Sequence, residues 1–181
     1  MRKLVIQLRP TAGQAELIDQ SLECCLMLWN RMIADEAKLR AELGRHFIPT
    51  PAKYKREIPA LKQIDSLALS QLHKNLERAY RDHSFNPHDN PEPRPLESLH
   101  TYTTCCLQSK SGPSIRFEGG ALRLPKLGSV PTALGQELPE GSVLRSAEVG
   151  KKDGVYFCTL TYSEAAMPAA AAKEPPEQRT A

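Results

Sequence analysis

The sequence predicts an α+β fold in which a helical block is inserted after the first strand of a β-barrel or small sheet. Leu4, Ile6 and Leu8 alternate with their neighbours, which predicts a short strand that Pro10 ends. Helical periodicity follows, and further alternating runs begin only after Leu99. Because a lone strand must pair with another, we expect its partner among these later runs.

The first helix is predicted from Ala12 to Leu43. Thr11 and Gln14 have the spacing of a capping box, and Gly44 is a natural helix stop. Apolar residues follow at spacings of three and four, with Leu22, Cys25 and Met32 among them. An unbroken helix of this length is unusual in a compact domain, so we expect a break near its middle. The segment from His46 to Pro59 is rich in proline and basic residues and is predicted to be a loop.

A second helix is predicted from Ser66 to Asp82, capped by Asp65 or Ser66, with Leu76 in its core face. Its polar residues are left for solvent or a partner. The following NPHDNPEPRP, residues 86–95, is predicted to be a loop, and its histidines match no standard metal site.

Alternating apolar residues predict the later strands, and two of the connections between them contain a Gly-Gly or Asp-Gly dipeptide that favours a tight turn. The predicted strands are Thr101–Leu107, Ser114–Phe117, Ala121–Pro125, Ser142–Val149 and Gly154–Tyr162, with turns at Gly119–Gly120 and Asp153–Gly154. The last strand is apolar on both faces, which predicts a central position with both sides buried. Residues 164–181 lack large apolar residues except Met167, so we expect a disordered tail.

Composition restricts the function only weakly. The formal net charge of +3 over 181 residues is a slight indication of an anionic partner. No run is long and apolar enough for a membrane span, so no membrane association is expected. The five cysteines have no Cys-x-x-Cys spacing, which favours reduced thiols and a cytoplasmic protein. No catalytic or metal-binding motif is visible.

Five segments, in order, resemble the TnpB/OrfB transposon proteins, which are RNA-guided DNA endonucleases of insertion sequences. These are Leu8-Arg9-Pro10-Thr11 with Gln14, Leu22, Cys24-Cys25 and Leu28-Trp29-Asn30; Ile64-Asp65-Ser66 to Ala79-Tyr80; Tyr102-Thr103-Thr104; Leu122-Arg123-Leu124-Pro125-Lys126-Leu127-Gly128; and Gly154-Val155-Tyr156-Phe157 with Leu160-Thr161-Tyr162. The resemblance covers about residues 3–163.

The resemblance implies a wedge-type β-barrel with an inserted helix-turn-helix-like recognition block. On this interpretation residues 1–10 form the first barrel strand, 11–83 the recognition block, 84–100 a proline-rich loop, 101–163 the remaining barrel strands and 164–181 the tail.

The resemblance also implies binding of guide RNA and of double-stranded DNA next to the target. Hydroxyl and amide side chains can read base edges, basic side chains can hold phosphates, and tyrosines can stack on bases. The candidate residues are Lys53, Tyr54, Lys55, Arg56, Ser66, Ser70, Gln71, Lys74, Arg78, Thr103, Thr104, Arg123 and Lys126, with Arg81 and Arg116 as further phosphate contacts. Helix capping, β-propensity and a solvated surface are the structural alternatives for these residues.

Two departures from the family pattern are visible. Residues 86–98 are acidic and proline-rich where the family usually has a basic segment. The family's catalytic carboxylates and zinc ribbon lie beyond the resembling residues, so we expect no nuclease activity in this chain, and Mg and Zn only with that nuclease part. A separate RuvC-like polypeptide would then complete the enzyme. The alternatives are a non-cutting regulatory module that binds DNA or RNA, and a decayed remnant without function.

Overall fold

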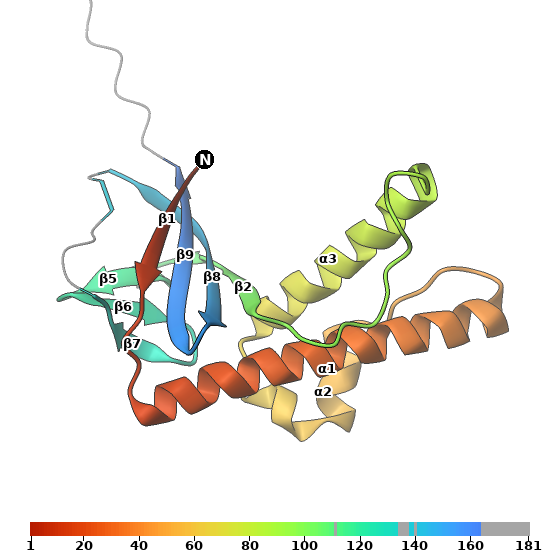
Figure 1. The fold of residues 1–181 in the computed structure, drawn as a ribbon, viewed down its shortest axis with the longest axis horizontal. Helices are drawn as coiled ribbons and strands as arrows, with labels where there is room; N and C mark the ends of the chain where they lie inside the picture. Colours follow the sequence, from red (N-terminus) through yellow and green to blue (C-terminus); the bar gives the residue numbers. More distant parts are fainter. Residues whose placement is uncertain (111, 134–137, 140, 164–181) are drawn as a thin grey trace, which may run out of the picture.

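The computed structural model describes all residues except 111, 134–137, 140 and 164–181, so the predicted disordered tail lies outside the described residues. Figure 1 shows a group of strands at one end of a long helix, α1, and a second helix, α3, rising beside that group. The predicted α+β class is confirmed, and the helices lie between β1 and β2 in the chain. No described helix is long and apolar enough to cross a membrane.

The main sheet has four strands in the order β1-β9-β8-β2, and all neighbours are antiparallel. Its strands are β1 (Arg2–Gln7), β2 (Thr101–Cys105), β8 (Val143–Lys152) and β9 (Val155–Ser163). The first strand therefore pairs with the last one, as the need of a lone strand for a partner predicted. Asp153 and Gly154 both have positive φ, 51° and 79°, and form the tight turn between β8 and β9.

The remaining strands form two smaller sheets. β3 (Gln108–Ser109) pairs with β4 (Gly112–Pro113), while β5 (Arg116–Glu118), β6 (Ala121–Leu124) and β7 (Gly128–Pro131) form a three-stranded meander. Gly119 and Gly120 make the predicted turn with φ of 56° and 83°. The strand β7 was not predicted.

The described strands do not close into one barrel, so the predicted closure is wrong. Backbone hydrogen bonds join the edge of the main sheet to the meander, from Arg9 to Pro131 (2.7 Å) and from Ala133 to Gln7 (3.0 Å). These bonds are local, and ladder pairing leaves three separate sheets among the described residues. β9 is central as predicted, but only one of its faces is buried, because Phe157, Thr159 and Thr161 are partly exposed.

The helix α1 (Ala12–Leu43) has the predicted bounds and runs unbroken for 32 residues, so the expected break is absent. The predicted capping box at Thr11 and Gln14 is present, and Gly44 ends the helix in the left-handed conformation. The side chain of Gln14 also donates to the backbone oxygens of Leu127 (3.1 Å) and Ser129 (3.0 Å). The start of α1 is thereby tied to the meander, and the helix can extend beyond the strands as one rigid element.

The predicted loop between His46 and Pro59 contains helical structure, which corrects that prediction. α2 (Pro51–Glu57) begins with proline in the first turn, and the 3-10 helix η1 (Pro59–Lys62) follows it. Proline suits the first turn of a helix because its missing N–H has no partner there anyway. Ile48 and Tyr54 from this stretch, and Leu61 and Ile64 just after it, are buried in the core.

The helix α3 (Ser66–Phe85) extends three residues past its predicted end and is capped by Asp65, whose carboxylate accepts from the Leu67 N–H. Its buried face consists of Ala68, Leu69, Leu72, His73, Leu76 and Tyr80. Residues 86–100 then return to β2 without helix or strand, as predicted. α3 packs mainly on β2 and also on α1, which sets the position of its exposed side.

Candidate nucleic-acid interface

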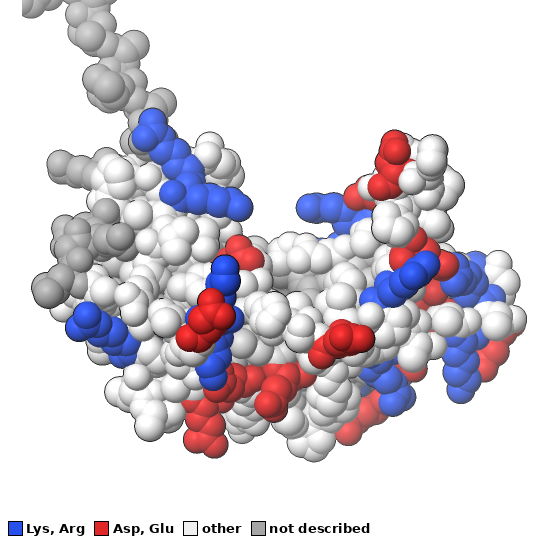
Figure 2. Space-filling view, in the orientation of Figure 1, with Lys and Arg blue, Asp and Glu red and all other residues white. Residues whose placement is uncertain are grey.

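A groove lies where α3, β2 and α1 meet, and it has a volume of about 270 Å³. Gln71 and Asn75 of α3, Thr103 of β2 and Trp29 of α1 line it, and Leu96 and Leu99 close one side. Figure 2 shows this face of the molecule hollowed between the strands and α3, with basic side chains on both walls reaching towards the hollow. Gln71 and Thr103 were predicted from sequence as base-reading residues, and the fold brings them into one groove.

The groove offers both donors and acceptors. The Gln71 side-chain amide donates to Asn75 Oδ1 (2.9 Å) and its oxygen accepts from the Cys105 thiol (3.6 Å). Across the β2–β8 pair, Glu148 lies opposite Thr103 and accepts from the Thr101 hydroxyl (2.8 Å). Amides, hydroxyls and a carboxylate are the groups that recognise base edges by hydrogen bonds. The sequence analysis did not predict Trp29 or Glu148 as site residues, because only the strand register and helix packing place them here.

The exposed side of α3 carries a stripe of polar and basic residues. Gln71, Lys74, Arg78 and Arg81 are spaced by three, four and three positions, so they share one face of the helix. Of these, Lys74, Arg78 and Arg81 are exposed. Ser70 lies beside this stripe. This face of α3 therefore carries positive charge that continues along the helix from the groove.

Basic side chains of α2 lie near the N-terminal end of α3. Lys55 of α2 donates to the Ser66 hydroxyl at 2.6 Å, which brings two predicted residues together. Arg56 is exposed beside it. Lys53 instead lies 3.6 Å from the carboxylate of Asp35, so its charge is partly compensated.

Two predicted residues are core residues. Tyr54 is fully buried and donates to Asp35 at 3.0 Å, and burial, with the charge of Asp35, raises the pKa of its phenol. Thr104 is 2% exposed and donates to Asp65, the cap of α3. Neither side chain has a surface on which a base could rest, so both hold the helices in place.

The predicted residues Arg123 and Lys126 lie apart from the groove, on the meander. They line a separate depression of about 420 Å³ together with Arg116. Glu118 lies 2.6 Å from Arg116 and 3.6 Å from Arg123. Burial raises the pKa of Glu118, but hydrogen bonds from Ser129 and Arg116 and the nearby arginine charges outweigh it and lower that pKa. Much of the positive charge of the two arginines is therefore compensated locally.

The segment 86–100 is fixed to α1 beside the groove. The Asn30 side chain donates to the Leu96 oxygen (2.9 Å) and accepts from the Leu96 N–H (2.8 Å). The Trp29 indole donates to the Arg94 oxygen (3.2 Å), and Arg40 pairs with Glu92 (2.8 Å). These contacts hold the acidic segment against the helices. In the described part of the chain, no group of three or more His, Cys, Asp and Glu residues is placed to hold a metal ion.

Comparison with known protein families supports a nucleic-acid-binding role. Residues 1–45 match the family model of the helix-turn-helix domain of IS605-type OrfB proteins, which indicates nucleic-acid binding. No curated protein matches the chain. The matched residues form β1 and the single helix α1. Most of the candidate residues described above lie on α2, α3 and the later strands, outside the matched residues.

Proposed function

We propose that the chain binds nucleic acid along α3, and the proposal starts from the match of residues 1–45 to the family model of the helix-turn-helix domain of IS605-type OrfB proteins. In this proposal α3 is the reading helix, the groove beside it receives base edges, and its basic stripe holds the phosphate backbone. The observation that carries the proposal is the placement of Gln71 and Thr103 in one groove, next to Lys74 and Arg78 on the outer face of α3.

The division of roles follows from the chemistry of the side chains. The amide of Gln71 and the hydroxyl of Thr103 can donate and accept, which suits base edges in a groove of a duplex. Lys74, Arg78 and Arg81 can only donate and carry a charge, which suits phosphates. The Lys55–Ser66 pair extends the phosphate contacts to the N-terminal end of α3.

The finer assignment is that the chain holds a guide RNA and reads a short DNA motif next to the target. It is supported by the resemblance of segments throughout residues 3–163 to TnpB proteins, in which wedge and recognition parts bind these ligands. A test is binding of RNA transcribed from the chain's own locus, compared with duplex DNA, across a salt series. Equal affinity for this RNA and an unrelated RNA of the same length would contradict the guide-RNA assignment.

The variant Lys74→Gln with Arg78→Gln tests the phosphate contacts. Removing each phosphate contact should reduce the slope of the logarithm of affinity against the logarithm of salt concentration by about 1. The matched control is Lys38→Gln, because Lys38 is 73% exposed on α1 and pairs only weakly with Glu42 at 3.9 Å. The same salt slope in both variants and in the unaltered protein would contradict the proposal.

The variants Gln71→Ala and Thr103→Val test base reading. Loss of one good base contact should cost about 1–3 kcal/mol of discrimination between duplex sequences while the salt slope stays unchanged. The measurement is competition between duplexes that differ at single positions. A uniform loss over all sequences would assign these residues to the backbone instead.

We further propose that cutting is carried out by a separate RuvC-like polypeptide bound to this fold, because the family places its catalytic carboxylates in such a domain. Cleavage of target DNA on mixing the two polypeptides with guide RNA and Mg²⁺ is the expected result. Failure of the two to co-elute when the RNA is present would refute this partnership.

A further inference from the structure

We propose that the far end of α3 carries a second site, which accepts an unpaired nucleobase of single-stranded nucleic acid. The site is a pocket of about 370 Å³ lined by His46, Glu77, Tyr80, Arg81, Ser84 and Phe85. Its size is within the range of small-ligand pockets. The inference rests on the proposed function, since it extends nucleic-acid binding to a part of the surface where the sequence assigns a role only to Arg81.

Three of the six residues that line this pocket carry aromatic rings: His46, Tyr80 and Phe85. Phe85 is 84% exposed, which is unusual for a large apolar side chain and leaves its ring faces available. The rings of His46 and Tyr80 lie 4.8 Å apart at an angle of 50°. Proteins that bind single strands use such exposed rings as stacking platforms, because every base has a flat face.

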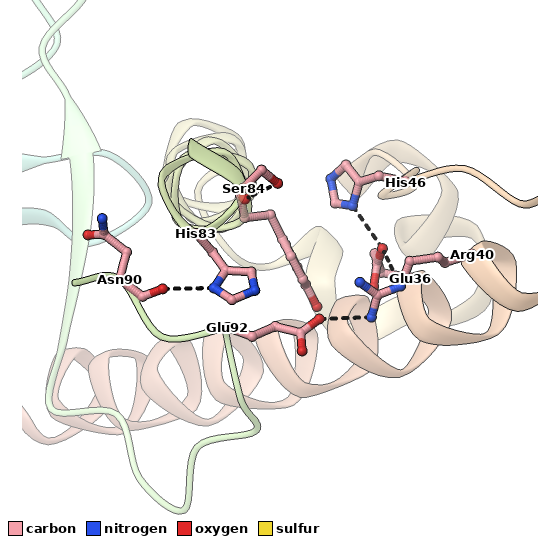
Figure 3. Close-up of polar contacts among 8 residues, drawn as sticks. Glu36, Arg40, His46, His83, Ser84, Asn90 and Glu92 are labelled. Carbon is pink, nitrogen blue, oxygen red and sulfur yellow. Dashed lines mark hydrogen bonds and ion pairs between the residues drawn. The ribbon is translucent and has the colours of Figure 1, made fainter. Parts of the chain in front are cut away.

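The position of the His46 ring is fixed by a buried carboxylate. Glu36 on α1 is fully buried, and its Oε1 lies 2.8 Å from His46 Nδ1 and 3.5 Å from Arg40 Nε. Figure 3 shows His46 directed at Glu36, with Arg40 between this pair and Glu92. A proton on Nδ1 lets His46 donate to Oε1 of Glu36 and leaves Nε2 of His46 able to bond a base edge.

Tyr80 forms the floor next to His46 and stays uncharged. Its side chain is 5% exposed. Burial and the negative charges of Glu36 and Glu92 raise the pKa of its phenol to about 12. A neutral floor imposes no repulsion on a bound strand, and Glu77, the carboxylate on the rim, is 3.6 Å from His73 Nδ1.

The basic stripe of α3 leads to this pocket. Phe85 follows Arg81 by four positions and Arg78 by seven, so it continues the face formed by Gln71, Lys74, Arg78 and Arg81. From Gln71 to Phe85 the helix rises by about 21 Å. A strand whose phosphates follow the stripe would arrive at the pocket with its next base beside Phe85, and Arg81 is shared by stripe and pocket.

The test uses the full chain and a labelled single-stranded RNA of about 12 nucleotides, with a duplex DNA as second probe. Phe85→Ala should weaken single-strand binding by about fivefold or more, the usual effect of losing one base–aromatic stack, and Phe85→Tyr should restore it. Duplex binding should be unchanged in both. Phe47→Ala is the matched control, because Phe47 is also an exposed aromatic residue, at 46%, and does not line the pocket.

The outcomes separate this site from the proposed function. One outcome is that Phe85→Ala and Phe47→Ala bind the single strand equally well, while the variant Lys74→Gln with Arg78→Gln binds nucleic acid more weakly. This outcome would contradict the base-binding pocket and support the α3 interface. A protein that binds neither probe would overturn both. Because the Phe85 ring makes little buried contact, unchanged thermal unfolding of Phe85→Ala is expected and is measured alongside.

Discussion

Gly150 in β8 leaves no room for a side chain. A Cβ there would lie 2.5 Å from the His100 backbone oxygen and 2.6 Å from Thr101 Cγ2. Gly150→Ala should therefore lower the free energy of unfolding by about 1–3 kcal/mol through overpacking, and displace the start of β2. Denaturant unfolding measures the change.

The control for Gly150→Ala is Gly13→Ala. No atom outside its own helix backbone lies within 4 Å of a Cβ at Gly13, and its backbone is not left-handed. In the first turn of α1, alanine should leave stability unchanged or raise it by up to about 1 kcal/mol. If the free energy of unfolding changes by the same amount in both variants, the close contacts at Gly150 add no cost of their own, and this prediction is wrong.

At the residue scale, sequence identified the side chains whose chemistry suits nucleic acid but not the direction in which each points. Tyr54 and Thr104 have suitable groups, yet both donate inward to Asp35 and Asp65. The period of α3 places Leu76 on the buried face as predicted, but His73, a polar residue predicted to be left for solvent or a partner, is buried as well. Tyr54 lies on a helix of seven residues, which is too short for periodicity to reveal its buried face.

At the scale of elements, the segment 86–100 is held by few contacts, and Asn30 makes two of them. Asn30→Ala removes both hydrogen bonds to Leu96, which should cost about 1–2 kcal/mol of local stability. The Leu96 amide should then exchange its hydrogen faster. Hydrogen-exchange mass spectrometry of peptides covering residues 94–99 measures this.

Asn75→Ala provides the comparison for Asn30→Ala, since Asn75 bonds Gln71 on its own helix rather than the segment 86–100. It should leave exchange in residues 94–99 unchanged. If Asn30→Ala also leaves it unchanged, Trp29 and Arg40 hold the segment without Asn30.

The elements that sequence predicted best are those with explicit end signals. α1 has the predicted bounds because the Thr11–Gln14 box and Gly44 define both ends. α2 was missed because its proline content favours a loop when the chain is read locally, although Pro51 suits the first turn. β7 was missed because Gly128–Pro131 is short and lacks alternation, and its pairing with β6 depends on the turn that Lys126 makes at a φ of 67°.

At the scale of the whole molecule, α1 joins the strands and the remaining helices, so we expect one cooperative unfolding transition. Trp29, the single tryptophan, lies on α1 beside the segment 86–100 and reports on tertiary packing there. Its fluorescence and the far-UV circular dichroism should therefore change together in urea. Two separated transitions would show that strands and helices unfold independently, and a broad transition without a plateau would favour a decayed remnant.

The insertion of the helices after β1 could be predicted because a lone strand has to find a partner later in the chain. Barrel closure could not be predicted, because it depends on whether the edges of the main sheet and the meander meet along their whole length. Among the described residues, the β-bridge that joins the two edges is the one between Leu8 and Thr132. The groove between α3 and β2 could not be predicted from the sequence either, because the packing of α3 on β2, and not the spacing in the sequence, brings Gln71 and Thr103 together.

The pairing of β1 with β9 also sets an order of events during protein synthesis. The ladder partner of Arg2–Gln7, residues 157–162, is synthesised about 150 residues later in the chain. At usual elongation rates the first strand waits roughly ten to thirty seconds with its backbone groups unpaired by that ladder. The helices form from local contacts and can fold meanwhile. The ladder between β1 and β9 can therefore form only after the segment that separates them has been synthesised.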